Sequence, residues 1–370
     1  SFEDLSTTSL EFYDRSSAES TSDGASTPDC QITTVFEGPE KTMEVVFRPD
    51  VGHPNGLRAL ARKQLDHLCK KARCLILHQT SNKYMDSYIL SESSLFVYKH
   101  KLIMKTCGTT TLLHCLSTLI GYADALGMEL TWVGYSRKNL GNPSAQSWPH
   151  SSFGDEIKFI DTHEKLQDRL HGTGYILGPV TGDHWFVYVA DHPDFSPLNK
   201  TIPTYTPLSP SQDRTINLMM FDMARDVAEI FYQRTGLTAK EMTKKSGIDK
   251  LCLGAIIDET LFEPCGYSMN ALLDKSYFTI HITPEEEGSY VSYETNVRLS
   301  NYDALVRNVL TVFGPKRFVL TMFGDQTAID NMNTLPTDPL EVKLKYGKYK
   351  RHSISSTKVD KELNCLMGCY

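Results

Sequence analysis

The segment Tyr88-Ile-Leu-Ser-Glu-Ser-Ser-Leu-Phe-Val97 decides how this chain is interpreted. Two apolar runs of β type are interrupted by Ser91, Glu92, Ser93 and Ser94, and a continuous buried strand does not explain that interruption. The segment is therefore either a turn or a site of backbone chemistry. A serine hydroxyl can attack the carbonyl of the preceding residue and move that acyl group from nitrogen to oxygen. The resulting ester can eliminate and leave a ketone-bearing pyruvoyl group at a new N-terminus.

The composition is that of an ordinary globular protein. Of the 370 residues, 40% are hydrophobic and 22% are charged, which allows a sizeable core. The net charge of −7 argues against a general nucleic-acid binder. No apolar run is long enough to cross a bilayer, and the N-terminus lacks a signal pattern. The nine cysteines form no Cys-x-x-Cys pairs, which predicts reduced thiols, no metal site and a cytoplasmic location.

Composition also divides the chain into five segments. Residues 1–30 form an acidic arm rich in Ser and Thr that we expect to be disordered. Residues 31–190 are the first half of the fold and contain the candidate cleavage site. Residues 191–212 hold five prolines and are interpreted as a connector. The second half is expected at 213–330, and no structure is assigned to the tail at 331–370.

Hydrophobic periodicity predicts a similar order of strands and helices on both sides of the connector. Expected strands lie at 35–47, 73–78, 87–91, 94–106, 129–135, 174–179, 183–190, 254–262, 277–283, 289–296 and 317–323. Expected helices lie at 56–71, 109–126, 154–169, 221–235, 238–246 and 302–313. Alternation in the strand at 277–283 puts Tyr277, Thr279, His281 and Thr283 on one face. The grouping favours an α+β fold of antiparallel sheets covered by helices, in two similar halves.

Two clusters in the first half contain residues suited to chemistry. In Phe36-Glu-Gly-Pro-Glu-Lys41, Glu37 and Glu40 flank a tight turn, although most such carboxylates are simply solvated. In Lys105-Thr-Cys-Gly-Thr109, Cys107 lies at a strand end just before an expected helix. A helix dipole and backbone amides there can lower the pKa of a thiol, whereas a buried inert cysteine is the alternative.

Two further clusters lie in the second half. Phe262-Glu-Pro-Cys-Gly-Tyr-Ser-Met-Asn270 combines Cys, Tyr and Ser on a segment bent by Pro and Gly. Such a segment either aims side chains at a site or is an ordinary irregular loop. His281-Ile-Thr-Pro-Glu285 places a histidine on a strand, where a structural role is the common one.

Taken together and in this order, these motifs resemble those of the eukaryotic S-adenosylmethionine decarboxylase family. The matching segments are Phe36–Lys41, Tyr88–Val97, Lys105–Thr110, Tyr135–Asn139, Pro264–Asn270, Thr279–Glu285 and Tyr290–Asn296. The resemblance covers about residues 35 to 325. It implies a four-layer αββα sandwich, with two antiparallel sheets face to face and helices outside.

The resemblance also implies a reaction. The chain would cut itself between Glu92 and Ser93, and Ser93 would become a pyruvoyl group in place of pyridoxal phosphate or a metal. Its ketone would form a Schiff base with S-adenosylmethionine, and Cys107 would return a proton to the α-carbon after decarboxylation. Glu37 and Glu40 would line this catalytic site. The product would be the aminopropyl donor for spermidine and spermine synthesis.

The remaining roles follow from the same resemblance. In processing, Ser268 would hold the cyclic intermediate and His281 would remove the proton for elimination. The two cleaved fragments would stay together as one unit, and dimers of such units occur in the family. Substrate-binding residues would be Phe36 and Phe262 stacked on the adenine, Glu285 on the ribose hydroxyls, and the backbone of Glu92 on the adenine edge.

The family also includes members activated by putrescine, a dication held by buried acids. Matching the segment Asp213-Arg-Thr-Ile-Asn217 retains the first acid and replaces the second by an amide, which predicts weaker stimulation. A permanent charge network without ligand is the alternative. The candidate residues for this site are Asp213, Thr215, Asn217, Glu294, Lys105 and Arg137.

Two other classes of function remain open. A cysteine hydrolase would pair Cys107 with His281, but no orienting Asn or Asp is evident and the serine segment would go unexplained. A catalytically weak regulatory subunit is the other class. The presence of Ser93, Cys107, Ser268 and His281 disfavours it.

Overall fold

A computed structural model describes residues 36–192, 214–333, 340–344, 347–359 and 363–370. The arm expected at 1–30 and nearly all of the connector expected at 191–212 therefore lie outside the described residues.

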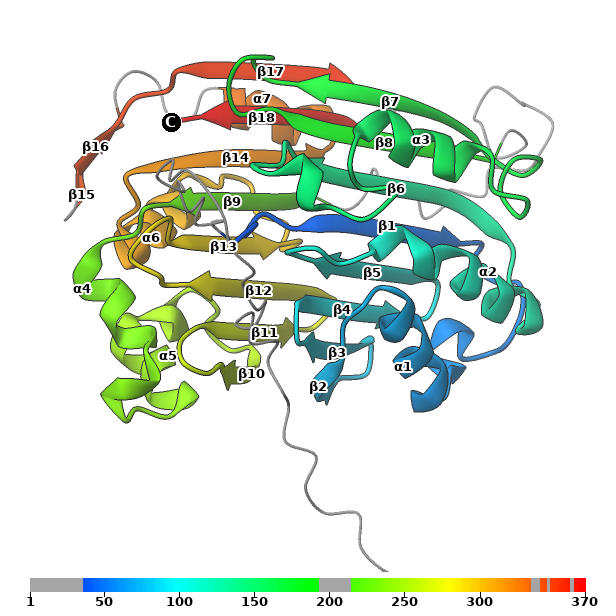
Figure 1. Ribbon diagram of the computed structural model, residues 1–370, viewed down its shortest axis with the longest axis horizontal. Helices are drawn as coiled ribbons and strands as arrows, with labels where there is room; N and C mark the ends of the chain where they lie inside the picture. Colours follow the sequence, from blue (N-terminus) through cyan, green and yellow to red (C-terminus); the bar gives the residue numbers. More distant parts are fainter. Residues whose placement is uncertain (1–35, 193–213, 334–339, 345–346, 360–362) are drawn as a thin grey trace, which may run out of the picture. The chain divides into compact units, whose positions relative to one another are not determined.

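Two antiparallel sheets of eight strands each form the centre of the fold (Figure 1). The strands of the first sheet, from edge to edge, are β2 (Ile76–Ser81), β3 (Met85–Leu90), β4 (Ser93–Tyr98), β5 (Lys101–Thr106), β1 (Lys41–Phe47), β6 (Leu130–Lys138), β8 (Trp185–Asp191) and β7 (His171–Leu177). Those of the second sheet are β10 (Ile256–Leu261), β11 (Tyr267–Leu273), β12 (Ser276–Thr283), β13 (Tyr290–Thr295), β9 (Thr215–Phe221), β14 (Arg317–Gly324), β18 (Asn364–Cys369) and β17 (Ser353–Lys358).

The two sheets have the same topology, which confirms the prediction of two similar halves. In each, four consecutive strands form a meander, and the first strand of that half then pairs with the last strand of the meander. A separate small sheet pairs β15 (Leu340–Leu344) with β16 (Gly347–Tyr349).

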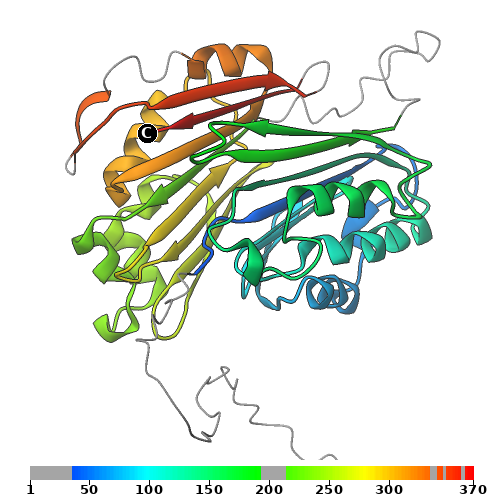
Figure 2. The same cartoon turned by 45° about the horizontal axis from the view of Figure 1, so that its top comes forward.

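Helices cover the outer face of each sheet, so the described body has four layers (Figure 2). The helices of the first half are α1 (Arg62–Lys71), α2 (Leu116–Ala125) and α3 (Phe153–Asp161). Those of the second half are α4 (Arg225–Ala228), α5 (Ala239–Ser246), α6 (Asp303–Phe313) and α7 (Gln326–Asn333). This arrangement confirms the α+β sandwich.

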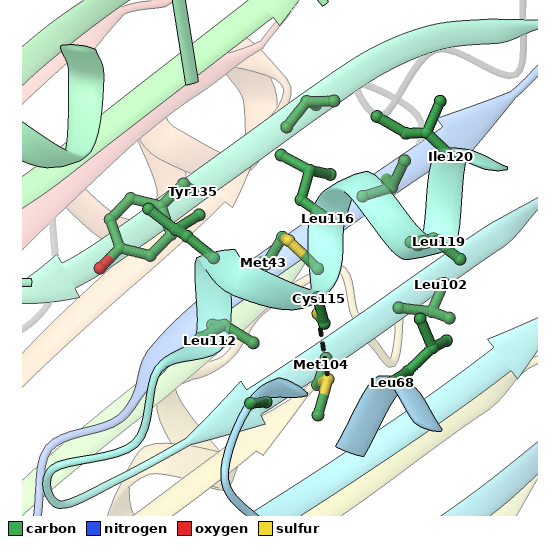
Figure 3. Packing of buried hydrophobic residues seen from close by; sticks show 14 of the residues in the cluster. Met43, Leu68, Leu102, Met104, Leu112, Cys115, Leu116, Leu119, Ile120 and Tyr135 are labelled. Atoms are coloured by element: carbon green, nitrogen blue, oxygen red, sulfur yellow. Dashed lines mark hydrogen bonds between the residues drawn. The ribbon is translucent and has the colours of Figure 1, made fainter. Parts of the chain in front are cut away.

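Each pair of layers has its own hydrophobic core. Figure 3 shows the core between the first sheet and its helices, where Met43 and Met104 of the sheet meet Cys115 and Leu116. A second core fills the matching space in the other half. Between the sheets, Trp132 and Val187 of the first sheet share a cluster with Met219 of the second.

Alternation along β12 confirms the predicted face. Phe278, Ile280 and Ile282 belong to the helix-side core, whereas Tyr277 belongs to a cluster between the sheets. Thr279 and His281 point the same way as Tyr277, because both contact Ser94 of the first sheet. The polar residues of the predicted face therefore lie between the sheets.

Several predicted elements were wrong. The strand expected at 94–106 is two strands, because the polar pair Lys99-His100 turns between β4 and β5. In place of the helix expected at 221–235, the structure has the short helix α4 and two 3-10 turns, which follow the strand β9. The segment 262–270 is bent as predicted over residues 262–266, but from Tyr267 onward it is the regular strand β11.

Tertiary pairing accounts for the strands that were missed. No strand was expected at Thr215–Phe221, whose Leu and Met residues are good helix formers, but β9 is held there by neighbours on both sides, β13 and β14. In the tail at 331–370, to which no structure was assigned, β18 and β17 extend the second sheet.

Candidate active site

The interrupted serine segment is a tight hairpin between β3 and β4. Leu90 pairs with Ser93, and Ser91 and Glu92 form the turn. Ser93 has a φ of 139°, a backbone conformation that side chains with a Cβ rarely adopt. Ser93 is buried, and its hydroxyl has no hydrogen-bond partner in the described structure. Strain and an unpaired buried hydroxyl thus meet at one residue, a combination typical of functional sites.

The carbonyl group that precedes Ser93 is held by a second segment. The Glu92 carbonyl oxygen accepts a hydrogen bond from the Cys107 backbone N–H at 2.9 Å and one from the Cys107 Sγ at 3.2 Å. These two donors lie beside Glu92 because β5, which ends just before Cys107, pairs with β4. An N–H aimed at a carbonyl oxygen is the arrangement that stabilises a developing oxyanion.

Of the two alternatives for Cys107, a thiol with a lowered pKa is contradicted, and the thiol is the buried one. No helix begins directly after Cys107, because the chain first forms a 3-10 turn at Leu112–Cys115. Burial raises the pKa of Cys107 well above its usual value, and the charges of Glu92 and Glu40 raise it further. Burial likewise raises the pKa of the Glu92 carboxyl, whose Oε2 lies 3.7 Å from the Sγ. Cys107 is therefore a neutral thiol at neutral pH, suited to donate a proton.

Ser268 and His281 face one another as register partners on β11 and β12. The Ser268 hydroxyl lies 2.8 Å from Nδ1 of His281, and the hydroxyls of Ser94 and Thr279 lie 3.0 and 2.9 Å from Nε2. Burial lowers the pKa of His281 to about 3, with a further contribution from the charge of Lys105. The imidazole is thus a neutral base that contacts the residue next to Ser93.

The strand β1 and the segment before it bring three charged side chains to the same end of the first sheet. Glu37 accepts hydrogen bonds from the backbone of Gly141 and Asn142 at 2.8 and 3.2 Å, so it anchors the loop after β6. Glu40 crosses to the second sheet and accepts from Tyr290 at 3.0 Å.

Lys41 was missed by the sequence analysis. Its side chain is buried and donates to the Gly108 carbonyl at 2.8 Å and to Gln146 at 3.1 Å. Burial lowers the pKa of Lys41 to about 8. A signal was present, because alternation puts Lys41 on the face of β1 that carries Met43 and Val45 in the helix-side core.

The predicted substrate-binding residues make fewer contacts with the Ser93–Cys107 site than the residues described above. The Phe36 ring is 47% exposed and lies against the backbone of Gly108, beside the Cys107 turn. Phe262 packs against Gly266, just before β11. Glu285 is exposed at the end of β12, next to Cys265.

A cavity between the sheets contains most of the candidate putrescine residues. Thr215, Asn217, Glu294 and Arg137 line it, whereas Asp213 lies outside the described residues. The side-chain oxygen of Asn217 is buried and accepts no hydrogen bond from the part of the chain that the structure describes.

Glu294 and Arg137 in this cavity are already paired with charged side chains. Glu294 accepts from Lys105 Nζ at 2.6 Å and from the Tyr277 hydroxyl at 2.8 Å. Arg137 donates to Glu156 at 2.8 Å. The cavity therefore combines an internal charge network with one free amide oxygen.

Fold and site together define a four-layer α+β enzyme with its reactive groups on a strained hairpin that faces a buried histidine. A family model described as adenosylmethionine decarboxylase matches residues 33–370, and the chain belongs to this family. The S-adenosylmethionine decarboxylase proenzyme of Dictyostelium discoideum is 43% identical over 303 residues, which cover 79% of this chain and 76% of that protein. The corresponding Xenopus laevis proenzyme is 40% identical over 298 residues, covering 79% and 84%.

A solved structure shows the same fold. The Trypanosoma brucei AdoMetDC-delta26 monomer matches with a TM-score of 0.54 and 27% identity, covering 75% of this chain and 98% of that chain. Within the described residues, no cluster of His, Cys, Asp and Glu could hold a metal ion, and no helix is long and apolar enough to cross a membrane.

Proposed function

We propose that this chain is an S-adenosylmethionine decarboxylase proenzyme that cleaves itself between Glu92 and Ser93. The observation that carries the proposal is the geometry of that peptide bond. Ser93 combines a strained backbone with a buried, unpaired hydroxyl, and the Glu92 carbonyl accepts two hydrogen bonds from Cys107.

The first step moves the acyl group of Glu92 from nitrogen to oxygen. The Ser93 hydroxyl loses its proton as its oxygen bonds to the Glu92 carbonyl carbon. The Ser93 nitrogen gains a proton as the C–N bond breaks. Negative charge develops on the carbonyl oxygen, where the Cys107 N–H stabilises it. The strain at Ser93 is released as the peptide bond is lost.

The second step eliminates the ester. His281, neutral because its pKa is low, accepts the Cα proton of Ser93, and the Glu92 carboxylate leaves. The dehydroalanine that remains takes up water and loses ammonia, which yields a pyruvoyl group at residue 93 and a carboxyl group at residue 92. Antiparallel pairing of β3 with β4, and of β1 with β5 and β6, would hold the two fragments together.

The residues around Ser93 fit such a group without a metal or pyridoxal phosphate. A pyruvoyl group supplies an electrophilic carbonyl that accepts the electrons released when carbon dioxide leaves an amino acid. The neutral Cys107 thiol, beside Glu92, would return a proton to the α-carbon of S-adenosylmethionine. The exposed ring of Phe36, with Phe262 and Glu285, would bind the adenosyl group. The product would serve spermidine and spermine synthesis.

Intact-mass spectrometry of the full chain tests self-cleavage. We expect fragments 1–92 and 93–370, the latter with a pyruvoyl terminus, and one uncut chain for Ser93→Ala. Ser91→Ala is the matched control, because Ser91 lies in the same turn and its hydroxyl accepts from the Leu75 backbone N–H, away from the Glu92–Ser93 bond. Cleavage of Ser93→Ala at this bond would refute the mechanism.

The same experiment separates the two alternatives. An uncut wild-type chain with hydrolase activity would indicate a cysteine hydrolase, and an uncut inert chain would indicate a regulatory subunit. The geometry argues against the cysteine hydrolase, since the hydrogen bonds of His281 in the described structure go to hydroxyls and not to Cys107.

We also propose that the cavity between the sheets binds putrescine weakly. Asn217 lies opposite Glu294 in the register of β9 and β13, and its free oxygen can accept from an ammonium group. An amide attracts a dication less than a carboxylate does. The internal pairing of Glu294 with Lys105 also supports the alternative of a permanent charge network. Dimerisation and a cytoplasmic location stay predictions.

A further inference from the structure

His281 has hydroxyl partners on both of its ring nitrogens, so its two neutral tautomers are not distinguished by these contacts alone. Nδ1 faces Ser268, and Nε2 faces Ser94 and Thr279. A hydroxyl can donate or accept, whereas only the ring nitrogen without a proton can act as a base. The tautomer therefore decides which side of the ring removes protons.

Asn270 resolves this ambiguity. It lies on β11 opposite Thr279 of β12, and it reaches the first sheet from there. Its Nδ2 donates to the backbone carbonyl of Tyr88 at 3.1 Å. A carbonyl oxygen can only accept, so the amide nitrogen must face Tyr88 and the amide oxygen must face the Ser94 hydroxyl, 2.7 Å away.

The orientation of Asn270 fixes which atoms donate and which accept in the neighbouring hydrogen bonds. An amide oxygen can only accept, so the single proton of Ser94 is donated to Asn270. The Ser94 oxygen can then only accept from Nε2 of His281 at 3.0 Å, and it can accept from Thr279 as well. With the ring proton on Nε2, this contact is a hydrogen bond, whereas a bare Nε2 could accept only from Thr279 and would face the Ser94 oxygen as a second acceptor. The contacts therefore favour the Nε2–H tautomer, which leaves Nδ1 with its lone pair toward Ser268.

We propose that Asn270 is a positioning residue that, through Ser94, holds His281 in the Nε2–H tautomer and makes Nδ1 the proton-accepting atom of self-cleavage. Ser268 is then the hydroxyl that donates to this base. The assignment of a role in cleavage rests on the proposed function, whereas the tautomer does not.

The contacts leave little freedom for another arrangement. Asn270, Ser94 and Thr279 are all fully or nearly fully buried, so water does not compete for these hydrogen bonds. Reversing the direction of these hydrogen bonds would require the Asn270 amide nitrogen to face Ser94 and its oxygen to face the Tyr88 carbonyl. Two buried acceptors would then face each other, which costs the free energy of an unmade hydrogen bond.

Nitrogen-15 NMR of labelled histidine tests the tautomer directly. We would use the uncut Ser93→Ala chain, with His281→Gln to assign the His281 signals. We expect one protonated nitrogen at Nε2, and a mixture of tautomers when Asn270→Leu is added. Ser94→Ala, a smaller change that removes the acceptor facing Nε2, should have the same effect if Asn270→Leu does not fold. A His281 that carries its proton on Nδ1, or an unchanged tautomer in these variants, would overturn the proposal.

The rate of cleavage in chains that retain Ser93 tests the role. We expect Asn270→Leu to slow the appearance of fragment 93–370 by at least about tenfold, since a general base contributes more than that. Asn270→Asp keeps an acceptor toward Ser94 but loses the donor to the Tyr88 carbonyl, so it should restore only part of the rate. Asn364→Ala, which removes a buried amide on β18, is the control for a loss of stability. Normal cleavage in Asn270→Leu would overturn the role, whereas a wild-type chain that never cleaves would refute only the proposed function.

Discussion

At the scale of single residues, the backbone of Ser93 and the environment of Cys107 govern the chemistry. Ser93 holds a positive φ that would relax once the bond to Glu92 is broken. Cys107 contributes through two different atoms, since its N–H contacts the Glu92 carbonyl and its thiol lies beside the Glu92 carboxyl. A substitution of Cys107 can therefore separate the role of its backbone N–H from the role of its thiol.

Strain at Ser93 predicts an order of stability for two uncut variants. Ser93→Gly and Ser93→Ala both lack the hydroxyl and should both fail to cleave. Glycine adopts a positive φ without a steric cost, so Ser93→Gly should resist unfolding by about 1 kcal/mol more than Ser93→Ala. Urea unfolding of the two chains measures this difference. A more stable alanine variant would show that the folded chain does not strain this residue.

Cys107→Ala should separate cleavage from decarboxylation. Cleavage should persist, because the N–H of residue 107 still reaches the Glu92 carbonyl. Turnover should fall by about 10² to 10⁴, the usual contribution of a positioned proton donor. Carbon dioxide release from S-adenosylmethionine measures turnover, with Cys369→Ala as a control on the far β18 strand. Full turnover in Cys107→Ala would remove the thiol from the mechanism.

At the scale of elements, antiparallel register assembles the site. The β11–β12 hairpin sets Ser268 opposite His281 and Asn270 opposite Thr279. In the first sheet, Ser93 and Lys41 both pair with Thr106, so β4, β5 and β1 meet in one row beside Cys107. The buried Lys41 ammonium then ties this row to the turn at Gly108.

Lys41→Met should loosen that turn. The variant keeps the side-chain length but leaves the Gly108 carbonyl without its buried donor, which should cost about 1–3 kcal/mol of unfolding free energy. We expect kcat to fall more than KM rises, because the Cys107 thiol is displaced from the reacting atoms. Steady-state kinetics and urea unfolding measure both. Lys101→Met, on the same sheet at a partly exposed site, is the control. A stability loss with unchanged kcat would confine Lys41 to a structural role.

At the scale of the whole molecule, facing sheets bring distant segments into one interior. The cavity lies between strands of both sheets, and its residue Glu294 binds Lys105 across the sandwich. A ligand in this cavity would contact both halves at once. β5, which carries Lys105 and ends just before Cys107, connects this cavity to the active site, and Glu40 lines the cavity itself.

Asn217→Glu should strengthen the response to putrescine. A second carboxylate opposite Glu294 adds Coulombic attraction for a dication in a buried site. Half-maximal stimulation of the initial rate should therefore require less putrescine than in the unchanged chain. Asn55→Glu adds the same charge at an exposed turn and should leave the curve unchanged. Identical curves for Asn217→Glu and the unchanged chain would mean that this position does not tune the cavity.

Much of the fold could be predicted from alternation and turn residues, because those signals are local. Most strands and the helices α1, α2, α3, α5 and α6 were found in this way, and the polar face of β12 was placed correctly. The helix expected at 221–235 was wrong, and α7 was missed. The strands β9, β17 and β18 were missed because their state depends on neighbours far along the chain. Propensity within a short window does not contain that information.

The sequence by itself determined which chemical groups this protein possesses, since the serine segment, Cys107, Ser268 and His281 can be recognised in short motifs. Only the tertiary structure decided how those groups behave. Burial beside Glu92 made Cys107 a neutral thiol, and the bond from Ser94 to Asn270 joins residues 176 positions apart. Protonation and tautomer depend on desolvation and on the direction of hydrogen bonds, and both arise only when the two sheets meet.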